Sequence, residues 1–186
     1  DSEEDTEPQT GSLGYMFSDT TVEDNEKIYA FDSNGAMITK TGWAKLAVPE
    51  YLKAYYDATD RWVYVGNTKG ELATGWKRVS GKWYYLDPYA YQGICEVEED
   101  TYYYFDSSCA MRKGWINADY SGGWLASEEY TAESTFGAEA IYPYYGGTTW
   151  LYANGAGVLQ DGWQKISNVW YYFEGFRMRR GSVEID

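Results

Sequence analysis

A repeat of about twenty residues constrains the fold of this chain more than any other feature. Six segments begin with an aromatic-rich strand, continue through a turn and a short return strand, and in four cases close with Gly-Trp. Three of the five intervals between starts lie within one residue of 20. Such a period predicts a row of small units rather than one closed globule. The segments start at Lys27, Trp62, Trp83, Tyr102, Trp150 and Trp170.

Aromatic residues occupy fixed positions in this repeat. A tyrosine follows every start by two residues, and eight of the nine tryptophans stand either at a start or in a Gly-Trp that closes a repeat. Turns such as Asp32-Ser33-Asn34-Gly35 and Asn154-Gly155 tolerate the positive φ that hairpins need. A two-stranded hairpin is marginal in water, so strands that are apolar on both faces require stacked neighbours. The sequence therefore predicts an all-β fold, a β-hairpin solenoid of about six aromatic repeats.

Two of the five intervals are longer than the period, which places insertions at about 44–59 and 116–147. In the first insertion, apolar residues between Val48 and Tyr56 have helical spacing. In the second, Ser127-Glu128-Glu129 is typical of a helix N-cap followed by acidic first-turn residues. Both insertions are therefore expected to be short and partly helical.

The charge of the chain is concentrated at its N-terminal end. Residues 1–26 hold nine acidic residues and no Lys or Arg, and the whole chain has a net charge of −14. This pattern predicts an acidic N-terminal segment or linker, followed by a single repeat domain over 27–186. A nucleic-acid partner is not expected, because no basic stripe could neutralise phosphates. The sequence also has no apolar run of the length that spans a membrane.

The residue types disfavour catalysis and metal binding. Histidine is absent, which removes the commonest general base and metal ligand. Glycoside hydrolysis needs paired carboxylates in a pocket, and the repeat leaves little of the chain for a catalytic domain. We therefore expect no enzyme activity, no catalytic residue, no metal and no cofactor. The two cysteines, Cys95 and Cys109, could form one disulfide or remain two buried thiols.

Two segments carry a family resemblance. GWKRVSGKWYYLD (75–87) and GWQKISNVWYYF (162–173) resemble the repeats of choline-binding modules from Gram-positive surface proteins. Similar repeats occur in glucan-binding domains of secreted glucosyltransferases and in the C-terminal repeats of clostridial toxins. The resemblance covers roughly 27–186 and implies a secreted protein of the bacterial cell surface or cell wall.

The resemblance also implies ligand sites between successive hairpins. In choline-binding members, a site combines the Gly-Trp indole, the first aromatic residue of the next hairpin and a tyrosine of the hairpin after that. Carried onto this chain, the pattern predicts three sets: Trp76, Trp83 and Tyr104 with Met111 nearby, then Trp43, Trp62 and Tyr85, and finally Trp115, Trp150 and Tyr172. In the second and third sets, an insertion separates the first two aromatic residues in the sequence.

These expectations define a non-catalytic surface-polymer binding module. The partner would be choline on cell-wall teichoic acid, or a polysaccharide such as glucan, because aromatic rings can hold either a quaternary ammonium or the flat face of a sugar. The sequence leaves this choice open. The alternative from another class is a structural spacer or adhesin that binds a protein partner through the insertions.

Overall fold

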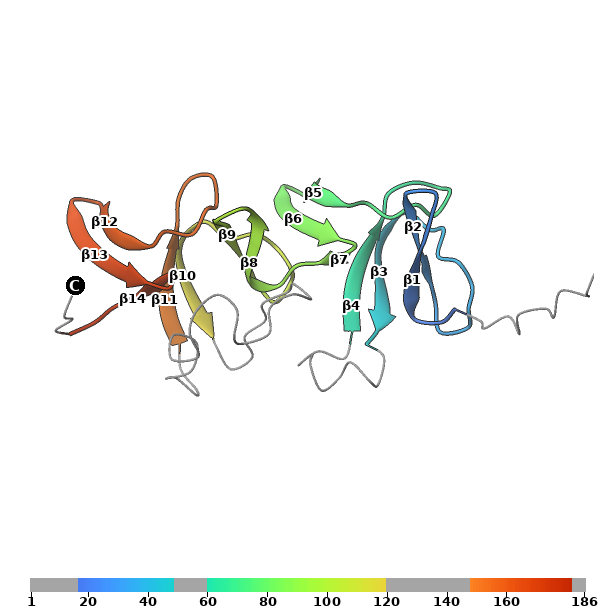
Figure 1. The fold of residues 1–186 in the computed structure, drawn as a ribbon, viewed down its shortest axis with the longest axis horizontal. Helices are drawn as coiled ribbons and strands as arrows, with labels where there is room; N and C mark the ends of the chain where they lie inside the picture. Colours follow the sequence, from blue (N-terminus) through green and yellow to red (C-terminus); the bar gives the residue numbers. More distant parts are fainter. Residues whose placement is uncertain (1–16, 49–59, 120–147, 182–186) are drawn as a thin grey trace, which may run out of the picture.

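The computed structural model describes residues 17–48, 60–119 and 148–181, and within these ranges all regular structure is β-strand. The strands form a row of hairpins along one long axis (Figure 1). The predicted all-β hairpin stack is therefore confirmed. The strands are β1 (Thr20–Asp24), β2 (Lys27–Phe31), β3 (Gly42–Ala47), β4 (Asp60–Val65), β5 (Gly75–Val79), β6 (Lys82–Asp87), β7 (Tyr89–Ala90), β8 (Gly93–Glu98), β9 (Thr101–Phe105), β10 (Gly114–Asp119), β11 (Thr148–Ala153), β12 (Gly162–Ile166), β13 (Val169–Glu174) and β14 (Arg177–Met178).

Each main hairpin pairs a Gly-Trp strand with the aromatic strand that follows it. β5 and β6 are antiparallel, with Trp76 opposite Tyr85, and β3–β4, β10–β11 and β12–β13 repeat this register. The sequence analysis paired the aromatic strand with its own return strand. The structure shows this strand pair only in the last repeat, where β13 pairs with β14. In other repeats the return segment makes an isolated bridge, such as Phe105 to Met111. The reason is length, because the return segment is too short to form a ladder before the chain moves to the next hairpin.

Tight turns close the hairpins that have no insertion. Ser80-Gly81 and Ser167-Asn168 have positive φ at both residues, with values of 49° and 83° in the first and 50° and 65° in the second. Positive φ at both central residues characterises the type I′ turn, whose twist matches that of the flanking strands. These dipeptides, rather than the Asp/Asn turns chosen from the sequence, fix the register of the main hairpins.

The Asp/Asn turns instead connect one hairpin to the next. The Oδ1 atom of Asp106 accepts the N–H groups of Ser108 and Ala110 at 2.8 and 3.1 Å. The fourth residue of this turn, Cys109, has a φ of 61° and donates its N–H to the Asp106 carbonyl at 2.7 Å. The same bonds recur in the turns that begin at Asp32, Asn67 and Asn154, where the fourth residue is glycine.

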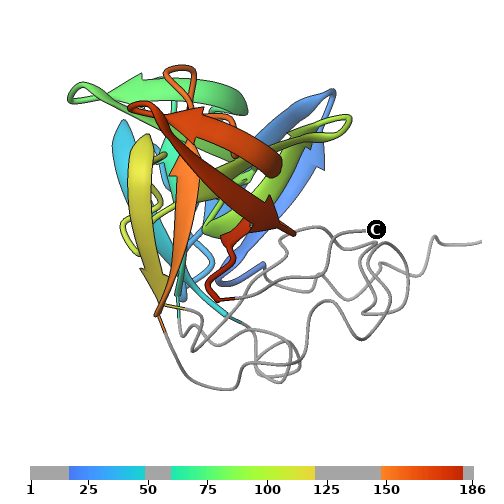
Figure 2. The ribbon, with the colours of Figure 1, turned by 90° about the vertical axis from the view of Figure 1, so that its left-hand side faces the viewer.

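Successive hairpins are rotated about the long axis. Viewed along this axis, β1–β2 overlaps β8–β9, β3–β4 overlaps β10–β11, and β5–β6 overlaps β12–β13 (Figure 2). Backbone bonds tie each return segment to the preceding hairpin at 2.8 Å: Leu72 N–H donates to Ile28, Met111 N–H to Trp83, and Leu159 N–H to Tyr102. The result is a stack in which every layer is hydrogen-bonded to its neighbour.

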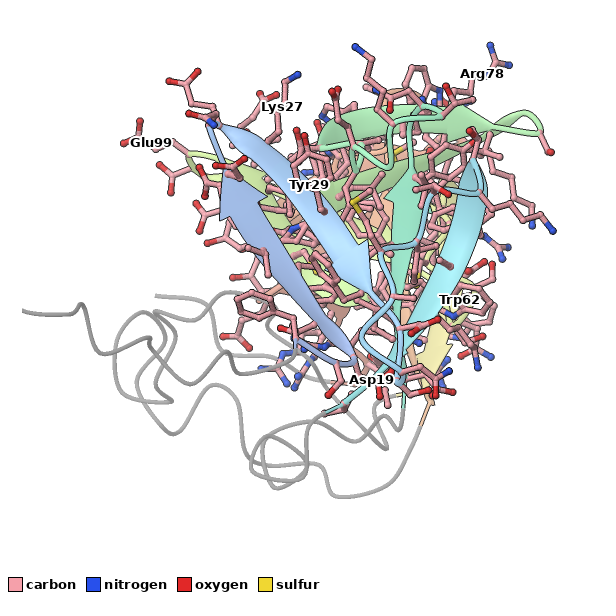
Figure 3. All side chains as sticks on the ribbon, turned by 90° about the vertical axis from the view of Figure 1, so that its right-hand side faces the viewer. Asp19, Lys27, Tyr29, Trp62, Arg78 and Glu99 are labelled. Carbon is pink, nitrogen blue, oxygen red and sulfur yellow. The ribbon has the colours of Figure 1, made fainter. Side chains whose placement is uncertain are left out.

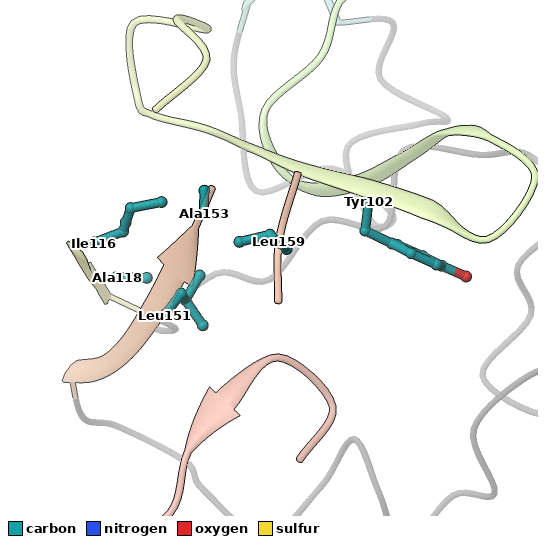
Figure 4. Close-up of a cluster of buried hydrophobic side chains, with 6 residues drawn as sticks. All are labelled: Tyr102, Ile116, Ala118, Leu151, Ala153 and Leu159. Atoms are coloured by element: carbon teal, nitrogen blue, oxygen red, sulfur yellow. The ribbon is translucent and has the colours of Figure 1, made fainter. Parts of the chain in front are cut away.

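Small apolar clusters between the layers make up the core. One cluster combines Ile116 and Ala118 of β10 with Leu151 and Ala153 of β11, and Leu159 covers them from the following return segment (Figure 4). Leu151 and Ala153 are fully buried. Because side chains alternate across a strand, the inward residues form this core while Asn117 and Trp150 face the other way. A similar cluster lies between β2, β3 and β4.

Three predicted boundaries need correction. The first hairpin begins with β1, which lies inside the segment 1–26 predicted as a linker. Residues 44–47 belong to β3 and 116–119 to β10, so the first residues of both predicted insertions are strand residues. The predicted helices fall largely within 49–59 and 120–147, outside the described residues. The first residues of both predicted insertions form strands because every second side chain faces the core. These inward side chains are Ala44 and Leu46 in β3, and Ile116 and Ala118 in β10.

The first repeat also begins one residue later than predicted. Phe31 bridges to Met37 as Phe105 bridges to Met111, so Phe31 and Phe105 are equivalent. Ile28 rather than Lys27 therefore corresponds to Tyr102, and Ala30 rather than Tyr29 takes the third position of the strand.

Substitution of Gly157 tests the packing between layers. An alanine Cβ at this position would lie 2.6 Å from the Met111 Sδ atom, on a residue with a φ of +97°. We expect Gly157→Ala to lower the free energy of unfolding by about 2 kcal/mol, because both the clash and the left-handed backbone oppose it. Gly155→Ala is the matched control, since nothing lies within 4 Å of its added Cβ. Urea unfolding should find that control within about 0.5 kcal/mol of the parent chain, and equal losses in both variants would contradict the prediction.

Candidate functional site

The Gly-Trp indole forms the centre of a ring cluster on one face of its hairpin. In β5–β6, Trp76 lies opposite Tyr85 and two residue pairs away from Trp83, so the three side chains share a face. The ring centroids of Trp76 and Trp83 are 6.3 Å apart with the planes at 88°, and Tyr85 lies 5.3 Å from Trp76. This edge-to-face arrangement leaves part of each indole face uncovered by the other.

The following hairpin supplies a second tyrosine from its opposite face. Tyr103 of β9 lies 4.8 Å from Trp76, with the planes at 73°. Phe105, two residues further along the strand, is fully buried and lies 6.0 Å from the same indole. We call the cluster of Trp76, Trp83, Tyr85 and Tyr103 site 2.

The same four-ring cluster occurs at two other junctions. Site 1 is Trp43, Trp62, Tyr64 and Tyr84. The centroid distances from Trp43 to the other three rings are 6.3, 5.2 and 4.8 Å. Site 3 is Trp115, Trp150, Tyr152 and Tyr171, where the corresponding distances from Trp115 are 6.2, 5.1 and 4.8 Å. The agreement to 0.2 Å indicates one repeated geometry, although insertions separate β3 from β4 and β10 from β11.

Two other junctions differ from this pattern. In the last hairpin, Trp163 lies 6.4 Å from Trp170 and 5.2 Å from Tyr172, but no later hairpin within the described residues supplies a fourth ring. In β8–β9, the position that a tryptophan such as Trp83 takes in other hairpins is occupied by Tyr102, which stands opposite Glu96. The Tyr102 hydroxyl donates to Glu96 Oε2 at 3.2 Å, and Phe176 packs on the Tyr102 ring at 4.8 Å.

The predicted site residues are therefore only partly brought together. The three tryptophan pairs meet as expected, but the ring of the next hairpin that contacts each Gly-Trp indole is Tyr103, Tyr84 or Tyr171. The predicted Tyr104, Tyr85 and Tyr172 stand one residue later. Tyr85 and Tyr172 instead contact the tryptophan of their own hairpin, and Tyr104 packs against the cluster around Leu151. A shift of one residue moves a side chain to the other face of a strand, which explains the difference.

Met111 lies beside site 2, as predicted. Its N–H donates to the Trp83 carbonyl at 2.8 Å, and its side chain packs in the cluster that contains Trp76 and Tyr85. The residues that the sequence analysis missed are Tyr64, Tyr84, Tyr103, Tyr152 and Tyr171. Tyr64 and Tyr152 are tyrosines that follow a repeat start by two residues. The signal for Tyr84, Tyr103 and Tyr171 was a second tyrosine next to such a position, because two consecutive tyrosines in a strand must serve two different faces.

Solvent reaches one indole of each site. At sites 1 and 2 this is the outer indole, Trp62 or Trp83, which is 36% or 39% exposed. At site 3 it is the central indole of Trp115, which is 38% exposed. The tyrosines from the next hairpin at sites 1 and 2, Tyr84 and Tyr103, are each 8% exposed. Trp62 lies at the periphery of the stack (Figure 3). Sites 1 and 2 thus combine a buried floor with an accessible aromatic edge.

Burial raises the pKa of several groups around these sites. Desolvation raises the pKa of Tyr84, Tyr85 and Tyr103 above the ordinary tyrosine value. It raises the pKa of Tyr91, which packs 4.9 Å from Tyr85, to about 12, and that of the Cys109 thiol to about 11. These phenols and the Cys109 thiol are therefore neutral at physiological pH.

These shifts predict a loss of stability at alkaline pH. In the unfolded chain, the thiol and phenols deprotonate near their ordinary pKa values, about 9 and about 10, before they do so in the folded chain. The stabilisation is therefore fully present below about pH 9 and is lost as the pH rises toward about 12. Urea unfolding at several pH values should detect the decline. Tyr91→Phe should make the decline above about pH 10 shallower, and constant stability up to about pH 11 would contradict the assignment.

The two cysteines do not form a disulfide. Both side chains are buried thiols, and they belong to different clusters, Cys95 with Tyr103 and Cys109 with Tyr84. Of the two alternatives that the sequence left open, the structure therefore has the two buried thiols. The physical reason is that Cys95 lies on β8, whereas Cys109 takes the left-handed position of a connecting turn that packs toward the preceding hairpins.

The described ranges contain no candidate for a metal site or for a membrane-spanning helix. No three His, Cys, Asp or Glu side chains there are grouped as metal ligands would be. None of the described residues forms a helix with the length and apolar character of a membrane span.

The fold and the ring clusters define a class, a solenoid of stacked β-hairpins with aromatic sites at the junctions between layers. Residues 74–88 and 161–175 match the model of the cell wall binding repeat family. These two segments of the chain are therefore similar to the repeats of that family. The match covers β5–β6 and β12–β13, two hairpins that are closed by type I′ turns without an insertion.

Solved structures agree with this assignment. Choline binding protein F from Streptococcus pneumoniae, in the presence of a peptidoglycan analogue (tetrasaccharide-pentapeptide), is 26% identical with a TM-score of 0.50, over 86% of this chain and 40% of that chain. A second crystal form is 27% identical with a TM-score of 0.51, over 86% of this chain and 41% of that chain. This chain therefore spans less than half of that protein. No curated protein sequence matches it.

Proposed function

We propose that this chain is a non-catalytic module of a secreted protein that binds choline groups of a cell-wall polymer at sites 1, 2 and 3. The observation that carries the proposal is the recurrence of one four-ring cluster at three junctions, each with a tryptophan pair near a right angle. Packing alone requires apolar volume between layers, but it does not require the same edge-to-face pair of indoles at each junction.

The chemistry of a quaternary ammonium suits these clusters. Such a cation has no N–H to donate, so it is bound through the electron-rich faces of aromatic rings. Each ring contact contributes about 0.5–1 kcal/mol at a partly exposed site. Three or four contacts give a dissociation constant of about a millimolar, which corresponds to about −4 kcal/mol. The net negative charge of the chain further favours a cation over a bare phosphate.

Weak sites are effective when the ligand is itself repeated. Once one site is occupied, a polymer that carries many choline groups is held near the other two at a high effective concentration. The three sites lie along one row of hairpins, so a single polymer could engage more than one of them (Figure 1). The similarity to a choline binding protein whose structure was solved in the presence of a peptidoglycan analogue also supports a wall ligand.

Titration with choline chloride, followed by tryptophan fluorescence, tests the proposal. We expect saturable quenching in the millimolar range, and Trp83→Ala should remove the part that arises from site 2. Phe17→Ala is a matched control, since Phe17 is 51% exposed and packs on Phe31 rather than in a site. The control should titrate like the parent chain.

The same samples distinguish the other ligands. Retardation on dextran without any choline response would replace choline with a glucan, whose sugar rings also stack on indoles. The proposal would be overturned if choline causes no quenching, dextran causes no retardation and purified cell walls do not retain the chain. The remaining hypothesis would then be a spacer or an adhesin that binds a protein through the insertions.

A further inference from the structure

The strand register places two further side chains at each of the three sites. The first stands opposite the outer tryptophan on the Gly-Trp strand. The second stands opposite the tyrosine that the next hairpin contributes. Cross-strand partners share a face and lie within contact distance, so both positions border the ligand. At site 1 they are Lys45 and Lys77, at site 2 Arg78 and Cys95, and at site 3 Asn117 and Gln164.

Site 1 has a lysine ammonium over two of its rings. Lys45 Nζ lies 5.0 Å from the centroid of Trp62, and Lys77 Nζ lies 5.0 Å from that of Tyr64. Both distances are within the range of a cation–π contact. Lys45 also forms an ion pair with Asp60 at 2.6 Å, which holds the ammonium in place. The rings that an external cation would use are therefore already in contact with cations of the chain.

Sites 2 and 3 have progressively less positive charge at these positions. Site 2 has one cation, the exposed Arg78, which extends outward from the stack (Figure 3). Its other position is the buried thiol of Cys95. Site 3 has two neutral amides, and Gln164 Nε2 donates to the Asp161 carbonyl at 2.7 Å. Among the described residues, no lysine or arginine lies over a ring of site 3.

We infer that the three sites are graded for a cationic ligand, with site 3 the tightest and site 2 intermediate, and that Lys45 and Lys77 make site 1 the weakest. This inference rests on the proposed function. A fixed charge about 6 Å from the ligand changes the dissociation constant about threefold in a water-like dielectric. Asp60 offsets part of the charge of Lys45, but an incoming cation must also displace both ammonium groups from their rings. Together, these two effects should make site 1 about tenfold weaker than site 3.

The experiment is a choline chloride titration of the chain labelled with 5-fluorotryptophan and followed by ¹⁹F NMR. Single Trp→Phe variants assign the resonances of Trp62, Trp83 and Trp150 as reporters of sites 1, 2 and 3. We expect the Trp150 resonance to reach half of its shift at about one tenth of the choline concentration that Trp62 requires.

Exchange of the flanking residues provides the matched pair of variants. Asn117→Lys should weaken site 3 about threefold, and Lys45→Asn with Lys77→Gln should strengthen site 1 about tenfold, while site 2 stays unchanged. Adding Asp60→Asn to the site 1 variant removes the carboxylate that lost its partner. If the gain persists, it arises from the ring faces rather than from the free carboxylate.

The outcomes separate the two hypotheses. Shifts of equal midpoint at all three reporters, or exchanges that leave the midpoints unchanged, would overturn the grading while choline binding stands. If no reporter responds to choline, the proposed function fails, and the grading fails with it.

Discussion

Replacement of Trp76 by alanine should lower the free energy of unfolding by about 3 kcal/mol and abolish choline binding at site 2. The indole of Trp76 contacts rings from two layers, Trp83 and Tyr85 within its own hairpin and Tyr103 and Phe105 of the next. Its removal therefore opens a cavity at a layer junction as well as deleting the centre of the site. Urea unfolding measures the first effect, and the choline titration measures the second.

Two other tryptophans serve as controls for this prediction. Trp83 is 39% exposed, so Trp83→Ala should also abolish site 2 but cost only about 1 kcal/mol. Trp163 occupies the same repeat position as Trp76 but is 56% exposed and has no ring contacts from a following hairpin within the described residues. Trp163→Ala should therefore cost about 1 kcal/mol and leave sites 1 to 3 intact. Equal destabilisation by all three substitutions would contradict the layered contact scheme.

The Phe105→Ala substitution should be the most destabilising of the changes considered, at about 4 kcal/mol. The Phe105 side chain is fully buried and lies beneath Trp76 and beside Tyr91. The Phe105 backbone also forms a β-bridge with Met111, which lies in the segment that leads to the next hairpin. Thermal or urea unfolding, under conditions where the variant is still folded, should measure this loss.

Phe105→Ala should also weaken choline binding at site 2, although Phe105 is not one of the four site rings. Without the ring beneath it, Trp76 loses the packing that holds its orientation. Phe105→Leu should recover most of the stability, because a larger part of the volume is kept. Site 3 rests on Phe173, at the same distance and interplanar angle from Trp115 as Phe105 from Trp76, 6.0 Å and 35°, and should not change. A loss at site 3 equal to that at site 2 would indicate global unfolding instead.

These predictions share one physical basis, which is that the same rings stabilise the stack and form the sites. A lone hairpin cannot bury its two aromatic faces, so each layer depends on the next. The tyrosine that the next hairpin places on a Gly-Trp indole closes the core and completes a site in one contact. Stability and ligand binding should therefore decline together at inner positions such as Trp76, and separately at outer positions such as Trp83.

The spacing of aromatic residues was enough to predict the repeat and its fold class. Tryptophans at starts and in Gly-Trp identified which residues meet at the junctions, and all three predicted tryptophan pairs do so. These features are local or periodic, and strand periodicity and turn chemistry are readable from the sequence. The family resemblance added the expectation of a wall ligand to that reading.

Only the tertiary structure decided which tyrosine completes each site. Tyr103 and Tyr104 are adjacent and chemically identical, yet they lie on opposite faces of β9, and which face meets Trp76 depends on how the layers are rotated. The same rotation separates Cys95 from Cys109 and brings Lys77 of β5 over Tyr64 of β4. Contacts of this kind join residues of different layers, and their geometry is set by the stacking of whole hairpins, which no local pattern in the sequence encodes.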